Sequence, residues 1–203
     1  MAWVMSQYLT KIPKKNITAL SMLDHNRCVY QIAKKIKGDP ATVRNIICWG
    51  NHSKTLYPDV TYGTIGGHPI LSVIKDTDFI YKEFIEIIRN RAFMVQKQRQ
   101  QTAGFSTAAA VRDHIKYLHR GTPSGEWVSM GVYTSGKEYD VDEDLYFSFP
   151  IICENKKYEI VEGFKWDQFA KEQIDASIKE LKKEREECKS AIAGIEASTK
   201  PKP

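Results

Sequence analysis

Three side chains near the start of the sequence have the chemical types needed for acid–base work on an anionic substrate. Asp24 and Arg27 lie three residues apart, so they share a face if they lie on a helix. His52 lies in a polar loop directly after an apolar run. A carboxylate bonded to one imidazole nitrogen leaves the other nitrogen to act as a general base, and a planar guanidinium suits a carboxylate ligand. The alternative interpretation is a helix-capping Asp24, a solvated Arg27 and an ordinary loop histidine.

A helix and a strand are predicted to position these groups. Residues 24–37 place apolar side chains at helical spacing, and Gly38 ends that helix. Residues 43–49, VRNIICW, form a short apolar run that is rich in β-formers, which predicts a buried strand leading to the loop of His52. The base and its carboxylate would therefore come from two different elements.

The rest of the chain predicts an α+β fold. Long amphipathic helices are expected over residues 76–100, 105–119 and 166–194. Short strands are expected within residues 57–74, and antiparallel hairpin strands over 126–133 and 147–162, with turns at Ser135-Gly136 and Asn155-Lys156. Because strands and helices do not alternate regularly, a doubly wound parallel sheet is not expected.

Length and charge limit the function. A chain of 203 residues suits one domain, or one and a half at most, and disfavours a two-domain enzyme with complete cofactor and substrate domains. Thirty basic against 25 acidic residues give a net charge of +5, which is too mild to indicate nucleic acid. Four basic residues lie in the second half of the helix predicted over 76–100. They would contact phosphates in a nucleic-acid interpretation and be mostly solvated in any other: Arg89, Arg91, Lys97 and Arg99.

The cysteines indicate a reducing compartment, and the histidines give no indication of a metal site. Cys28, Cys48, Cys153 and Cys188 are widely spaced and form no C-x-x-C pair, so free thiols in the cytoplasm are expected. The five histidines form no H-E-x-x-H and no Cys/His cluster, so no metal site is expected. No apolar run reaches the roughly 18 residues of a membrane span, so no membrane partner is expected.

Two longer motifs resemble a known family. The stretches IPKKNITALSMLDHNRCVYQIAKKI and NIICWGNHSKTLYPDV are similar to cytosolic-type malate dehydrogenases of the lactate/malate dehydrogenase family, in which L-D-x-N-R opens a helix and W-G-N-H-S closes a strand. RDHIKYLHRGTPSGEWVSMGVY and DLYFSFPIICENKKYEIVEG match in the same order. The resemblance covers about residues 10–190 and implies the fold of the family's C-terminal substrate domain over residues 10–194. Residues 1–9 do not resemble the family, and a disordered tail is expected over 195–203.

The resemblance implies a role for each of the three residues. Arg27 would bind the C1 carboxylate of malate or oxaloacetate, and His52 would take the proton from the C2 hydroxyl. Asp24 would orient His52 and stabilise its protonated form. Residues 102–106 lie where the family has a small, Ser-rich pocket wall, although their polar residues differ from the usual pattern. Ser106 therefore either contacts substrate or belongs to an ordinary helix start.

The resemblance also implies NAD as cofactor, but the motif that would bind NAD is missing from this sequence. No G-x-G-x-x-G lies between a predicted strand and helix, so the main NAD-binding domain would precede residue 1, and the cofactor-binding residues are unknown. The chain is thus expected to be an incomplete form of an NAD-linked malate dehydrogenase, with little activity alone, that forms a homodimer or pairs with a full-length subunit. The alternative is a non-catalytic interaction partner of such a subunit.

Overall fold

The computed structural model describes residues 1–199 of the chain, with side chains to Ile195. The helices are α1 (Ala2–Tyr8), α2 (Met22–Lys35), α3 (Ile70–Val73), α4 (Phe84–Arg99), α5 (Gly104–Arg120) and α6 (Gln168–Thr199), with short turns η1 (Lys14–Asn16), η2 (Pro40–Thr42) and the π-helical η3 (Phe79–Glu83). The strands are β1 (Val43–Arg44), β2 (Ile47–Trp49), β3 (Tyr57–Asp59), β4 (Thr64–Ile65), β5 (His68–Pro69), β6 (Val128–Tyr133), β7 (Tyr146–Glu154) and β8 (Lys157–Ile160). This arrangement confirms the α+β prediction.

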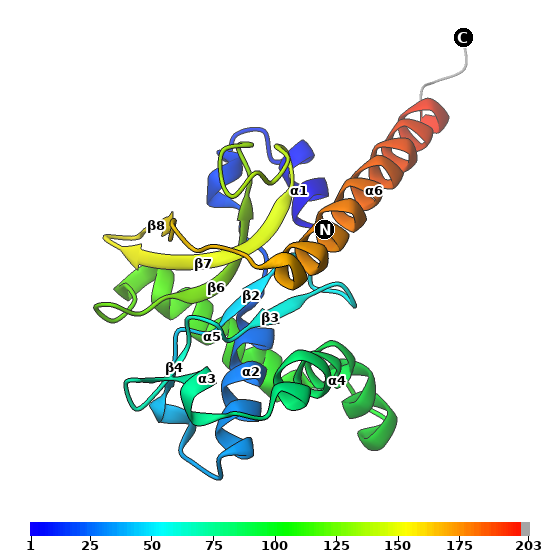
Figure 1. Ribbon diagram of the computed structural model, residues 1–203. Helices are drawn as coiled ribbons and strands as arrows, with labels where there is room; N and C mark the ends of the chain where they lie inside the picture. The colour runs from blue at the N-terminus through cyan, green and yellow to red at the C-terminus, as the bar shows by residue number, and fades with distance from the viewer. Residues whose placement is uncertain (200–203) are drawn as a thin grey trace.

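The largest sheet is antiparallel and has the order β6-β7-β8 (Figure 1). β7 and β8 are joined by Asn155 and Lys156, both at positive φ, which is the turn that the sequence predicts. The connection from β6 to β7 is longer than the predicted tight turn at Ser135-Gly136. Thr134 stabilises this loop because its hydroxyl donates to the Asp142 carbonyl at 2.7 Å.

The apolar run over residues 43–49 is two strands instead of one. Asn45 has a φ of 62°, which breaks the extended backbone between β1 and β2. Its side chain accepts a hydrogen bond from the Trp127 amide at 3.2 Å and donates to the Gly125 carbonyl at 3.1 Å. β1 pairs with β4, whereas β2 pairs with β3, so the break sends the chain from one small sheet into another.

Two bridges tie the elements of the candidate site to the large sheet. Ala19, just before α2, pairs with Gly131 of β6, and Gly50, just after β2, pairs with Ser148 of β7. A Cβ at Gly131 would lie 2.7 Å from the Ala19 Cβ, so this close approach requires glycine. The start of α2 and the end of β2 are therefore both fixed to neighbouring strands of one sheet.

Helix α2 lies between two apolar clusters. Met22 and Leu23 pack in the cluster under β6–β8, which includes the fully buried Trp49 and Phe147. Further along α2, Cys28, Ile32 and Ala33 pack in a second cluster with Phe84 of α4. Burial on both sides makes α2 a rigid support for polar side chains at its N-terminal end.

The remaining helices follow the predictions with local differences. The predicted helix over 76–100 begins as η3 and continues as α4, which ends where Gln100 takes a left-handed conformation, with a φ of 52°. α6 continues to Thr199, so residues 195–199, expected to be disordered, are helical instead; residues 200–203 lie outside the described residues. Within residues 1–199, no helix is both long and apolar enough to cross a membrane.

Candidate active site

Helix α2 presents Asp24 and Arg27 on one face, as their spacing predicts. Asp24 is 2% exposed and lies in the first turn, where the helix dipole favours an anion. The Arg27 Nη1 donates to Asp24 Oδ1 at 3.1 Å, and the two side chains are 11% and 3% exposed. The guanidinium and the carboxylate therefore form a nearly buried ion pair within one turn of the helix.

His52 reaches the same carboxylate from another element. Its Nδ1 is hydrogen-bonded to Asp24 Oδ2, while 54% of the side chain stays exposed. Asp24 thus binds Arg27 through one oxygen and His52 through the other. The structure brings together all three residues that the sequence singles out, with Asp24 in the middle.

This arrangement changes the acid–base behaviour of His52. The hydrogen bond from His52 Nδ1 to the Asp24 carboxylate raises the pKa of His52 above its usual value of 6.5, against the opposing effects of burial and of the nearby Arg27. A proton on Nδ1 is shared with the carboxylate, so Nε2 is the nitrogen left for a ligand.

The loop of His52 is held by α6. The Asn51 amide donates to Ser177 Oγ at 2.7 Å, and the Asn51 side chain donates to Glu180 Oε2 at 3.1 Å. Ser53 and Thr55 also donate to that carboxylate. Burial alone would raise the pKa of Glu180, but these three donors lower it below its ordinary value.

Gly50 makes the contact between the loop and α6 possible. Its φ is +94°, and a Cβ there would lie 2.2 Å from Ser177 Oγ. Sequence reasoning missed Ser177 and Glu180, because one acid in a run of mixed charges looks like a solvated helix face. In the sequence, only the three-residue spacing of Ser177 and Glu180 indicates that the two side chains share a helix face.

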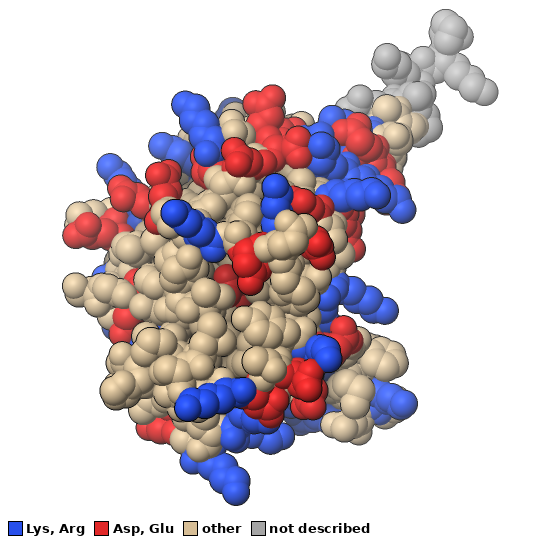
Figure 2. All heavy atoms as spheres, in the orientation of Figure 1, with Lys and Arg blue, Asp and Glu red and all other residues tan. Residues whose placement is uncertain are grey.

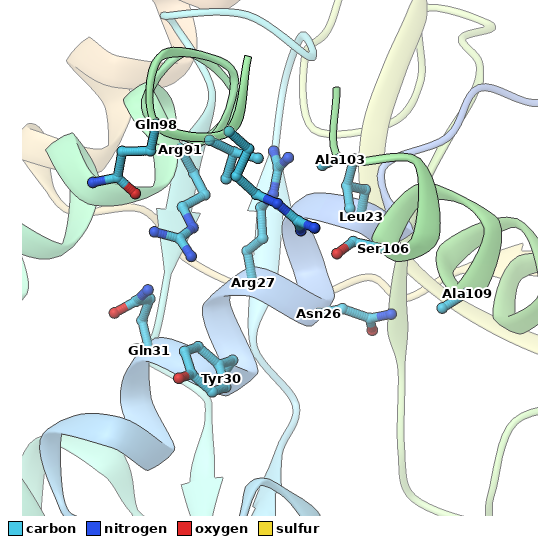
Figure 3. Close-up of a pocket in the computed structure, with 12 residues that line it drawn as sticks. Leu23, Asn26, Arg27, Tyr30, Gln31, Arg91, Gln98, Ala103, Ser106 and Ala109 are labelled. Carbon is cyan, nitrogen blue, oxygen red and sulfur yellow. The ribbon is translucent and has the colours of Figure 1, made fainter. Parts of the chain in front are cut away.

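A cavity opens beside Arg27, between α2 and the helices α4 and α5 (Figure 3). Its volume is about 440 Å³. Ala103 and Ser106, from the segment that the resemblance assigns to a pocket wall, line this cavity together with Arg27. α5 begins after Ala103 without a side-chain cap, so Ser106 does not act as an N-cap.

Two further histidines, His25 and His114, are buried and have structural partners. His25 Nδ1 lies 3.2 Å from Ser129 Oγ, and complete burial lowers the pKa of His25 to about 4. His114 Nε2 lies 2.9 Å from Thr18 Oγ1, and burial lowers its pKa as well. Both are neutral at neutral pH, which leaves His52 as the histidine with a charged partner among the residues the structure describes.

The described part of the chain shows neither a dinucleotide-binding turn nor a cluster of metal ligands. The glycines at 66 and 67 form the tight turn between β4 and β5, which is not a phosphate-binding turn between a strand and a helix. Across residues 1–199, no group of three or more His, Cys, Asp or Glu side chains could hold a metal ion.

Both signs of charge are interspersed over the face shown in Figure 2. That face carries no continuous basic stripe of the kind that tracks a nucleic-acid backbone.

Comparison with known proteins identifies the family that the sequence motifs resemble. Residues 21–192 match the family described as lactate/malate dehydrogenase, alpha/beta C-terminal domain. Malate dehydrogenase 3, cytoplasmic, of Arabidopsis thaliana is 39% identical over 195 residues, which cover 94% of this chain and 57% of that protein. The cytoplasmic malate dehydrogenase of Felis catus is 40% identical over 179 residues, covering 86% of this chain and 54% of the relative.

Solved structures agree. The malate dehydrogenase of Naegleria fowleri is 34% identical with a TM-score of 0.86, over 93% of this chain and 57% of that one. A Trichomonas vaginalis lactate dehydrogenase in complex with NADH and oxamate is 31% identical with a TM-score of 0.90, over 95% of this chain and 60% of that one. The chain spans between half and two thirds of the length of the relatives it matches.

Proposed function

Since the chain belongs to the lactate/malate dehydrogenase family and matches its C-terminal domain, we propose that it carries the substrate-binding and proton-transfer groups for the reversible, NAD-linked oxidation of L-malate to oxaloacetate. The observation that carries the proposal is Asp24, a buried carboxylate that joins the base His52 to the carboxylate-binding Arg27. The cytoplasm is the proposed location, as in the names of the relatives.

Arg27 holds the substrate in this mechanism. One of its nitrogens is bound to Asp24, which fixes the plane of the guanidinium. The remaining donors face the cavity and have no partner among the described residues, so they are free for the C1 carboxylate of malate. A planar donor fork fixes the orientation of the C2 carbon as well as its position.

His52 moves the proton. Its neutral Nε2 accepts the proton of the C2 hydroxyl, and Asp24 stabilises the imidazolium that results. In the reverse direction, protonated His52 donates to the C2 carbonyl of oxaloacetate. The raised pKa of His52 favours the protonated form that this second direction needs.

The dinucleotide itself does not fit the residues described, because no strand–glycine loop–helix unit is present to hold its pyrophosphate. The proposal for this chain is therefore limited to binding and proton transfer. Loss of reactant positioning removes on the order of 7–11 kcal/mol of barrier lowering, so the isolated chain is expected to reduce NAD with malate very slowly or not at all.

The experiment that tests the proposal measures binding and turnover separately. Calorimetry with L-malate and with oxaloacetate should show binding to the 203-residue chain that is weakened in Arg27→Gln. Malate-dependent NADH formation should stay near background. Equal binding by wild type and Arg27→Gln, or turnover like that of a complete dehydrogenase, would contradict the proposal.

Exposed apolar side chains favour a second candidate, a dimerising or interaction role. Tyr30 of α2, Phe93 of α4 and Phe105 of α5 are 52%, 64% and 91% exposed. Large apolar side chains left exposed to this extent are typical of an interface. Light scattering of the chain, alone and mixed with a full-length subunit, should then show a dimer or a mixed complex, and a strictly monomeric chain would contradict this role.

A further inference from the structure

Two unpaired arginines face the cavity beside Arg27. Arg91 and Arg99 lie on α4 with Val95 and Gln98 at the spacing of one helix face, and all four line the cavity. Within residues 1–199, neither arginine makes an ion pair or a hydrogen bond, whereas Arg89 on the same helix donates to the Leu56 carbonyl at 2.7 Å. α4 therefore directs its unpaired guanidinium groups toward the cavity.

The opposite wall is also polar and carries no negative charge. Residues 23, 26, 27, 30 and 31 of α2 face the same space, and they include Arg27 and the amides of Asn26 and Gln31. Figure 3 shows Arg27 and Arg91 extending into the space from opposite sides. No aspartate or glutamate is among the lining residues, since Asp24 lies behind Arg27. The charge of Arg27 is already compensated by Asp24, but Arg91 and Arg99 have no acidic partner among the described residues and repel each other unless an anion lies near them.

We propose that Arg91 and Arg99 form an anion subsite next to Arg27 that binds a small polycarboxylate. Guanidinium groups match carboxylates in a bidentate geometry, and side-chain amides and the Ser106 hydroxyl offer further hydrogen bonds to such a ligand. The cavity of about 440 Å³ is within the usual range for small-molecule sites of about 300–1,000 Å³. The subsite rests on the proposed function only in sharing Arg27, and it needs neither His52 nor a cofactor.

Calorimetric titration of the full chain with tricarballylate at low ionic strength tests the subsite. The wild type should bind one equivalent, and Arg91→Gln/Arg99→Gln should bind about tenfold more weakly or worse, because two charged donors are lost. Arg120→Gln is the matched control: Arg120 is an exposed arginine of α5 that also lacks a partner within the described residues but lies outside the cavity.

His52→Asn separates this subsite from the proposed function. It should remove the pH dependence of oxaloacetate binding, whereas Arg91→Gln/Arg99→Gln should keep that pH dependence while losing affinity for tricarballylate. Arg99 is exposed, so Arg99→Gln alone decides the matter, by a measurable loss of affinity, if the double variant does not fold. The proposal is overturned if the wild type does not bind, if the arginine variants bind like the wild type, or if Arg120→Gln loses as much affinity as they do.

Discussion

Replacing Asp24 by asparagine tests the centre of the site. Asp24→Asn keeps the shape of the side chain and one oxygen acceptor, but it removes the negative charge that His52 and Arg27 share. The pKa of His52 should then fall from its raised value, because its hydrogen bond to Asp24 is the main cause of that rise. Titration of the His52 ring protons by NMR measures this directly, and His25 serves as an internal reference.

The stability cost follows from burial. A hydrogen bond to a charged group contributes about 1.5–3 kcal/mol, and the Arg27 half of the pair is nearly buried. Because an asparagine oxygen still accepts from Arg27, about half of that contribution is lost. The His52 side chain is 54% exposed, so solvent screening limits the contribution of the His52–Asp24 interaction to about 0–1 kcal/mol. The sum is about 2 kcal/mol, which lowers the Tm by about 4–8 °C in a chain of this size.

The pH dependence of this cost has a definite sign. A folded pKa above 6.5 means that the His52–Asp24 pair stabilises the fold fully below pH 6.5, and that this contribution is lost as the pH rises through the raised value. The difference in Tm between wild type and Asp24→Asn should therefore be larger at about pH 6 than at about pH 9.

Asp78→Asn is the matched control for this experiment. It breaks an ion pair with Lys82 whose side chains are 75% and 77% exposed, and it should leave the Tm unchanged. An unaltered His52 titration in Asp24→Asn, or a gap in Tm that widens with pH, would refute the reasoning.

Three further outcomes are expected. Oxaloacetate should bind more tightly below the raised pKa of His52 and malate more tightly above it, and calorimetry across pH should find this reversal absent in His52→Asn. Glu180→Ala should speed amide hydrogen exchange in residues 51–55, because it removes an acceptor that Asn51, Ser53 and Thr55 share. Unchanged exchange would show that Glu180 does not hold the loop. Phe147→Ala should cost about 3–5 kcal/mol in denaturant unfolding, since Phe147 is fully buried, and a loss near zero would contradict its place in the core.

Much of the fold could be read from the sequence, because local patterns set it. The helix spacing of residues 24–37, the turn at Asn155-Lys156 and the long C-terminal helix are all present close to the predicted bounds. The break at Asn45 could not be read, because it depends on bonds to residues about 80 positions away. Alternation of apolar residues does not report such distant partners.

For the site, the sequence by itself determined which groups are available: a carboxylate and a guanidinium three residues apart, and a histidine after a buried strand. Only the tertiary structure decided that Asp24 joins them, because the bridges from Ala19 to Gly131 and from Gly50 to Ser148 fix α2 and β2 to one sheet. It also decided that Glu180 holds the loop and that Arg91 and Arg99 line one cavity with Arg27. These contacts join residues far apart in the chain, and packing brings such residues together in ways that sequence spacing does not encode.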